Sequence, residues 1–264
     1  DHSLAFTYSR QLTRPNYADL NPFRFFLNEN DFDEGNPNLV PNFSQNFNLN
    51  WTIKNTYFID LYYRDNGRYI STLSFQNNEN QTLIQVKQNV LESISYGLDF
   101  TISTRLLPFW DVYFYNSVFY EDETFLAEQS EIETYKNVVT GYYGYLSNSF
   151  TLSRDGTLTG ETSLLYLSGF LNGSYKMSET ITWNIGLRQT LWDGRAVLTL
   201  TAEDILGRAN ATYTSRYANQ DNFFFALPET QFVRLGFTYN FGNFRLSSRS
   251  SDMRKSELQR IENE

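Results

Sequence analysis

Alternation of apolar and polar residues runs through most of this 264-residue chain, and no other feature constrains the fold as strongly. Within residues 231–241, every second position from 233 onward carries a bulky apolar or aromatic side chain, and Arg, Gly, Thr and Asn occupy the positions between. A period of two residues is that of a β-strand with one apolar and one polar face. In a soluble sheet the apolar face packs inward, whereas in a membrane barrel it faces lipid and the polar face lines the lumen.

The same alternation predicts ten strands, at residues 2–13, 43–54, 56–64, 93–105, 110–120, 142–153, 157–170, 180–191, 196–204 and 231–241. Each is about as long as a tilted strand must be to cross a bilayer. The connections near 55, 107, 155 and 193 are short, those at 14–42, 66–91, 121–141 and 205–230 are long, and 171–178 is intermediate. Sorting of short turns and long loops to opposite ends is typical of outer-membrane barrels. We therefore predict an all-β, antiparallel transmembrane β-barrel of roughly ten meandering strands.

The connections themselves carry further signals. Four prolines and Gly35 exclude regular structure from residues 14–42. The Asn/Gln-rich residues 66–91 are compatible with a small hairpin outside the main sheet, and residues 121–133 are predicted as an acidic loop. Asp-Gly pairs at 155–156 and 193–194 predict tight hairpin turns.

Composition agrees with a barrel and excludes several other classes. Aromatic residues make up 17% of the chain, which suits the aromatic girdles of a membrane barrel. The mean hydropathy is −0.48, and the sequence has no apolar run of the ~18 residues that a membrane-spanning helix needs. Because cysteine is absent, neither disulfides nor thiolate metal sites can form. A net charge of −9 argues against nucleic acid as the main partner.

Several short motifs resemble one known family. They are YSR at 8–10, TRP at 13–15, LNPF at 20–23, GNPNL at 35–39, SYGLD at 95–99, EDIL at 203–206 and YNFG at 239–242. In order and spacing they resemble TonB-dependent outer-membrane receptors, and more narrowly the outer membrane protein beta-barrel family. That resemblance implies a ~22-stranded barrel with an N-terminal plug in its lumen. The chain would be the C-terminal part of such a receptor.

This resemblance implies a location in the bacterial outer membrane and two regions in the chain. Residues 1–242 would form the barrel portion, and residues 243–264 a polar periplasmic tail. The expected partners are outer-membrane lipid, an N-terminal barrel half and plug upstream of Asp1, and other outer-membrane or surface proteins. Two functions stay open: substrate uptake, or a structural barrel that docks partner proteins without active transport. A plug and an energy-coupling box encoded upstream would distinguish uptake from scaffolding.

Charged residues on the predicted polar face are the first candidate site, because they would line a transport path. They are Asp60, Arg64, Asp99, Arg105, Glu161, Arg188, Glu203 and Arg234. The alternative, which we favour, is that they pair with one another, contact a plug or are solvated.

Aromatic residues of two predicted extracellular loops are the second candidate site. They are Tyr17, Phe23, Phe25 and Phe26, with Phe32 beside them, and Phe223, Phe224 and Phe225. Packing between loops is the alternative for both groups, and we favour it for the first. His2 is the only histidine, and no calcium-loop or Gly-rich phosphate motif is present. We therefore expect no catalysis, no cofactor and no metal site.

Overall fold

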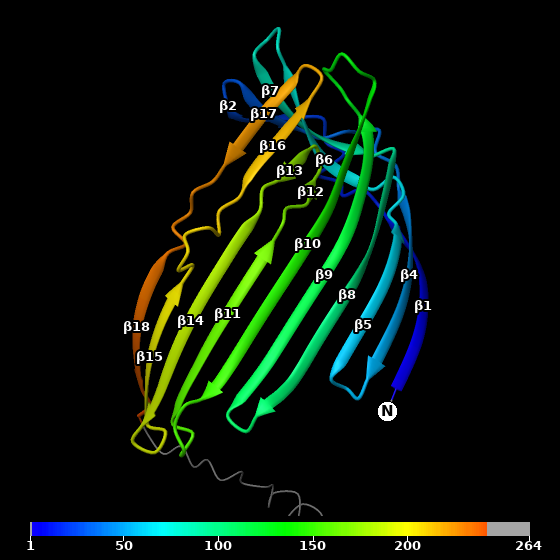
Figure 1. The fold of residues 1–264 in the computed structure, drawn as a ribbon. Helices are drawn as coiled ribbons and strands as arrows, with labels where there is room; N and C mark the ends of the chain where they lie inside the picture. Colours follow the sequence, from blue (N-terminus) through cyan, green and yellow to red (C-terminus); the bar gives the residue numbers. More distant parts are fainter. Residues whose placement is uncertain (1, 242–264) are drawn as a thin grey trace, which may run out of the picture.

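One curved antiparallel sheet of ten strands dominates the protein in the computed structural model, which describes residues 2–241 (Figure 1). Its strands are β1 (His2–Thr13), β4 (Asn42–Ile53), β5 (Tyr57–Asp65), β8 (Glu92–Leu107), β9 (Trp110–Leu126), β10 (Thr134–Thr151), β11 (Leu158–Leu167), β14 (Thr180–Leu191), β15 (Ala196–Glu203) and β18 (Phe232–Tyr239). They follow one another in this order across the sheet. All ten predicted strands are therefore present. The predicted tail, residues 243–264, lies outside the described residues.

The sheet has two edges, β1 and β18, and each of these strands has a neighbour on one side only. Within residues 2–241 the sheet is therefore open, and its ten strands do not close into a barrel. This part of the chain also contains no helix that is long and apolar enough to cross a membrane.

The apolar face of the sheet is exposed and organised in rows by the strand register. One cross-strand row consists of Tyr8, Phe47, Tyr63, Tyr96 and Tyr120. Two residues further along the strands, the facing positions are Phe6, Leu49, Leu61, Leu98 and Val118, all of them exposed. Toward the other end of the sheet, Trp110 stacks on Phe150, and Trp192 contacts Tyr239. Aromatic side chains thus flank an aliphatic band, as in the girdles of membrane barrels.

The spacing of these aromatic rows fits a bilayer. Tyr120 and Trp110 lie ten positions apart on β9, which is ~33 Å of strand at ~3.3 Å per residue. A tilt of about 40° reduces this distance to ~25 Å along the membrane normal, the height of the apolar band of an outer-membrane barrel.

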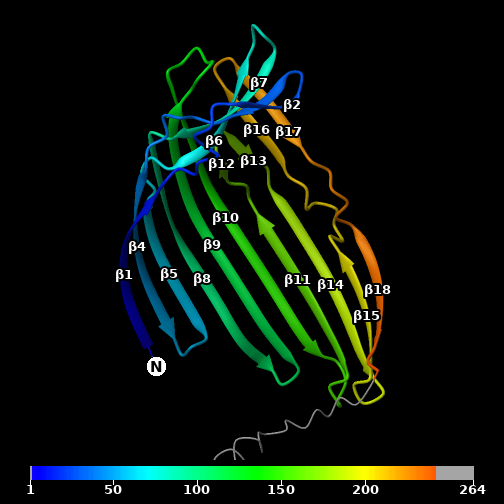
Figure 2. The ribbon, with the colours of Figure 1, turned by 180° about the vertical axis from the view of Figure 1, so that it is seen from behind.

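The connections are sorted to the two ends of the sheet (Figures 1 and 2). Short turns at 54–56, 108–109, 152–157 and 192–195 lie at one end, which we call the turn end. All other connections lie at the opposite end and form what we call the cap: residues 14–41, 66–91, 127–133, 168–179 and 204–231.

Two small sheets make up most of the cap. The first has the order β2 (Arg24–Asn28), β3 (Asp31–Glu34), β7 (Thr82–Asn89) and β6 (Ile70–Asn77), with β3 and β7 parallel. The second has the order β12 (Leu171–Asn172), β13 (Tyr175–Met177), β16 (Thr212–Tyr217) and β17 (Gln220–Phe225). The hairpin β6–β7 agrees with the expectation for residues 66–91.

Three expectations about the connections were wrong. Residues 14–42 contain β2 and β3, because the prolines flank residues 24–34 and do not interrupt them. The segment 121–141 is mostly strand, since β9 and β10 continue to pair up to Leu126 and Thr134 and leave only 127–133 as a loop. Segments 171–178 and 205–230 contain β12, β13, β16 and β17. β13 pairs with β16 and β16 with β17, so the two segments form a sheet that neither segment could form alone.

Candidate functional site

The cap leans over the polar face of the sheet where β8, β9 and β10 project beyond their neighbours. β5 ends at Asp65, opposite Ile94, and β11 ends at Leu167, opposite Tyr143. The polar face of the projection is covered by the main apolar cluster of the protein, which comprises Leu73, Phe75, Val90, Phe125, Ala127 and Tyr217. On its other face, Lys136 and Asp122 form an ion pair with an N–O distance of 2.7 Å. Such a charge pair indicates that the lipid-facing band has ended below it.

Side-chain amides join the two cap sheets to each other. The Gln76 N–H donates to Gln220 Oε1 at 2.6 Å, and Gln220 Nε2 donates to the Gln76 carbonyl at 2.9 Å. Gln220 is 2% exposed and also donates to the Gln129 carbonyl in the β9–β10 loop. Because one side chain satisfies backbone groups of two other loops, the loops hold together as one body.

A buried carboxylate lies beneath this body. Glu123 is 3% exposed and faces Ser93 on β8 and Asn137 on β10. It lies in the part of β9 that projects with β8 and β10 beyond the other strands of the sheet. Its Oε2 accepts a hydrogen bond of 2.6 Å from the Tyr69 hydroxyl in the cap. Burial, with Glu121 nearby, raises the pKa of Glu123 from its ordinary 4.5 to about 7, although the Tyr69 bond acts in the opposite direction. The cap therefore rests on a group that titrates near neutral pH.

We predict that the cap loses stability as the pH rises. Glu123 ionises near 4.5 when unfolded and near 7 when folded, so its contribution is complete below 4.5 and is lost as the pH rises through 7. Between about pH 5.5 and about pH 8 the expected loss is ~2 kcal/mol. Hydrogen exchange of amides in β6 and β16, corrected for intrinsic rates, measures it. Glu123→Gln should remove most of the dependence, because Glu121 and Glu128, whose pKa values burial also raises, remain. A wild-type cap with pH-independent protection would contradict the prediction.

Below the buried carboxylate, the polar face holds a cavity of about 610 Å³ lined mainly by aromatic side chains, which we call the tyrosine cavity. The lining residues are Tyr62, Tyr113, Tyr115, Ser117, Phe119, Glu121, Tyr143, Tyr145, Leu167 and Phe170. Adjacent strands supply paired rings. The ring centroids of Tyr115 and Tyr143 are 5.6 Å apart, with the rings edge to face, and those of Tyr113 and Tyr145 are 6.0 Å apart. The Leu171 N–H of the cap donates to Glu121 Oε2 at 3.1 Å and so ties the cap to the rim of the cavity.

Glycines in the middle of strands shape the floor of this cavity. Tyr62, Gly97, Phe119 and Gly141 face one another in this order across β5, β8, β9 and β10. A Cβ at Gly97 would lie 2.6 Å from the Tyr62 hydroxyl oxygen, and one at Gly141 would overlap the Phe119 ring. The rings therefore lie flat on the sheet only because the facing residue has no side chain.

These tyrosines were not predicted as a site from the sequence. Their signal is present in the chain, as Tyr at alternate positions 113, 115, 143 and 145 together with mid-strand glycines on the polar face. What the sequence lacks is the register, which sets Tyr115 opposite Tyr145 and Ser117 opposite Tyr143.

The eight predicted lumen-facing charges all lie on strands of the main sheet, but they do not form one cluster. Asp60 and Asp99 face each other, and the Asn50 amide donates to Asp60. Glu161, Arg188 and Glu203 line two grooves of about 300 and 380 Å³ over β11, β14 and β15.

The remaining predicted charges contact neighbouring side chains. Arg105 makes two hydrogen bonds to Asp111, at 2.8 and 3.1 Å. The guanidinium groups of Arg64 and Arg234 lie over the rings of Tyr62 and Phe232 at 4.4 and 5.0 Å.

The predicted loop aromatics lie in the cap, outside the tyrosine cavity. Tyr17, Phe23, Phe25 and Phe26 are 60–94% exposed, and Phe223, Phe224 and Phe225 are 47–58% exposed. Phe23 and Phe25 line a separate cap pocket of about 380 Å³. Phe32 is buried and packs on Phe26, and Phe224 stacks on Tyr213 at 4.5 Å. Loop packing thus accounts for Phe32, whereas most of the others present open surface.

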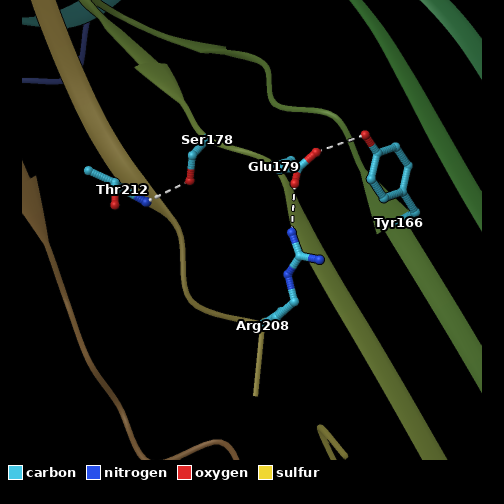
Figure 3. Close-up of polar contacts among 5 residues, drawn as sticks. All are labelled: Tyr166, Ser178, Glu179, Arg208 and Thr212. Atoms are coloured by element: carbon cyan, nitrogen blue, oxygen red, sulfur yellow. Dashed lines mark hydrogen bonds and ion pairs between the residues drawn. The ribbon is translucent and has the colours of Figure 1, made fainter. Parts of the chain in front are cut away.

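The EDIL motif has a structural role at the start of the β15–β18 connection. Asp204 is 1% exposed and accepts hydrogen bonds from the Arg208 and Ala209 N–H groups and from the Thr230 hydroxyl. Figure 3 shows the next contacts: Arg208 pairs with Glu179 at 2.7 Å, and Glu179 also accepts a bond from the Tyr166 hydroxyl. Beside them the Thr212 N–H donates to the Ser178 hydroxyl oxygen. These bonds fix the base of the cap to β11 and β14.

Comparison with known proteins gives one family match. The model of the outer membrane protein beta-barrel family matches residues 1–239, which include all ten strands of the main sheet. No curated protein matches the chain.

Proposed function

The chain belongs to the outer membrane protein beta-barrel family and is a protein of the bacterial outer membrane, and on this premise we propose that it serves substrate uptake. In this proposal the ten strands are part of the wall of a TonB-dependent-receptor-type barrel. Outer-membrane barrels have short periplasmic turns and longer extracellular loops, so in this proposal the cap lies outside the cell. The cap and the polar face would then meet the substrate in that order.

The two open edges of the sheet support the larger barrel on which this proposal depends. β1 exposes twelve residues along one edge and β18 eight along the other. In lipid each unpaired backbone group costs several kcal/mol, so a stable wall requires pairing at both edges. An N-terminal barrel half would supply the missing strands, and a plug inside it would contact the polar face. A wall completed in this way would reach the ~22 strands of such receptors.

Deletion of the gene in its own organism tests uptake. Wild-type and deletion cells are grown in a complex medium, and the depletion of each solute is measured with and without an uncoupler of the proton-motive force. We expect at least one solute whose depletion needs both the gene and the proton-motive force. Identical depletion profiles in wild-type and deletion cells would exclude the transport role.

A structural barrel that docks a partner protein is the second candidate, favoured by the exposed phenylalanines of β17. Phe223 and Phe225 stack at 6.5 Å on one face of the strand at 58% and 56% exposure. Exposed aromatic clusters of this kind are typical of contact surfaces. If docking is the function, Phe223→Ser with Phe225→Ser should release a partner that co-purifies with the wild-type protein, while solute depletion stays unchanged.

A further inference from the structure

Among the five cavities described in residues 2–241, the tyrosine cavity alone has a lining made mostly of aromatic rings. Five tyrosines and two phenylalanines contribute, and Tyr115, Tyr143 and Tyr145 are only half-buried beneath the cap. The rings come from neighbouring positions on β9 and β10 and spread over the sheet. They form an extended surface and do not enclose a single point, as an aromatic cage around an ammonium group does.

Charge narrows the class of ligand. The residues that line the cavity include neither Lys, Arg nor His, and Glu121 is their only carboxylate. Asp99 faces Ser117 across β8 and β9 and lies beside Tyr62 and Tyr115, although it does not line the cavity. Arg64 lies near Glu121 but does not line the cavity. An anionic ligand would face two carboxylates, while the nearest cation, Arg64, lies over the Tyr62 ring and outside the lining, so the site favours a neutral ligand.

Each tyrosine offers two kinds of contact. Its ring presents a broad apolar face, and its hydroxyl both donates and accepts a hydrogen bond. Glu121 adds a carboxylate acceptor, and Ser117 adds a hydroxyl. A ligand that matches this surface has flat rings with apolar C–H faces and many hydroxyl groups around their edges. Sugar rings have this structure, and a cavity of about 610 Å³ lies within the usual range for small ligands.

We propose that the tyrosine cavity binds a neutral oligosaccharide, with sugar rings on the β9 and β10 tyrosines and hydroxyl groups bonded to Glu121. These tyrosines are Tyr113, Tyr115, Tyr143 and Tyr145. The proposal rests on the uptake function only for its biological purpose, because binding itself needs no transport. Oligosaccharide that passes the cap would meet the polar face at this cavity, since Leu171 and Phe170 of the cap border it.

Saturation-transfer NMR on the purified protein in lipid nanodiscs tests the proposal. The neutral probes are maltohexaose, cellohexaose, xylohexaose, mannohexaose and chitohexaose. Citrate serves as the anionic probe and tetramethylammonium as the cationic probe. We expect saturation of ring C–H protons in at least one neutral probe and none in citrate. Tyr143→Ala and Tyr113→Ala should each weaken that binding by about tenfold, the effect of losing one aromatic contact.

Matched variants separate the cavity from the cap. Tyr113 is 41% exposed, so its replacement should not disturb folding, and Tyr143→Phe keeps the ring while removing the hydroxyl. Tyr17→Ala removes a tyrosine that is 94% exposed in the cap and should leave binding unchanged. Three results would overturn the proposal: no neutral probe binds at millimolar concentration, binding is insensitive to both alanine variants, or only tetramethylammonium binds. Saccharide binding without gene-dependent uptake would support the binding site and refute transport. Gene-dependent uptake without saccharide binding would support transport and refute the binding site.

Discussion

Replacing Phe125 by alanine should open the cap while the ten-stranded sheet stays folded. Phe125 is fully buried at the end of β9, and its ring contacts Phe75, Tyr135 and Tyr217 at centroid distances of 6.4, 5.8 and 5.9 Å. Loss of a buried phenylalanine typically costs ~3–5 kcal/mol, because the removed ring leaves a cavity. Three separate segments meet on this ring, so its loss weakens the packing between all of them.

Hydrogen exchange resolves where this cost falls. In Phe125→Ala, amides of β6 and β16 should lose most of their protection, whereas those of β4, β5 and β14 should keep theirs. Phe225→Ala is the matched control, since the same truncation at a side chain that is 56% exposed should have little effect. Unchanged protection of β6 and β16 in Phe125→Ala would show that another contact holds the cap.

The cap also shows where prediction from the sequence fails. The ten long strands could be predicted, because alternation is a local property and each strand carries it through its whole length. The small sheets could not, since β3 is four residues long and pairs in parallel with β7 some fifty positions later. Pairing of that kind depends on contacts that no local pattern records. Glu123 was assigned to an acidic loop for the same reason, although its strand continues and the cap buries it.

In the candidate site, too, local features could be predicted from the sequence and long-range pairing could not. Alternation correctly separates the two faces of each strand, and it sets Tyr113 and Tyr115 on the face opposite to Val112 and Phe114. It does not give the register that brings tyrosines of β9 and β10 together, nor the depth at which a residue lies. The charged residues were predicted as a site because charge in a membrane sheet is costly. The larger cavity is formed by tyrosines, whose amphipathic rings fit a polar face and do not disturb the alternation.

Leu235→Arg should strongly destabilise the sheet in a bilayer. Leu235 is 70% exposed and continues a cross-strand row with Leu200 and Leu187 on the apolar face. It lies four positions from Tyr239, or ~13 Å along the strand and ~10 Å along the membrane normal, which is close to the middle of the apolar band. An arginine at that depth costs ~2–4 kcal/mol in a β-barrel, because the guanidinium must leave water.

Thr238→Arg provides the matched control, since the same charge on the same strand then points from the polar face. Thr238 is exposed, and its own strand already carries Arg234 on that face. Urea unfolding in phospholipid vesicles, followed by the heat-modifiable band shift of folded barrels, should show the loss for Leu235→Arg and little change for Thr238→Arg. Equal stability of the two variants would mean that lipid does not cover the face that bears Leu235, and a larger loss for Thr238→Arg would reverse the assignment of the two faces. The comparison therefore tests the alternation from which the fold was inferred, at a residue where burial in the protein contributes little and lipid contributes most.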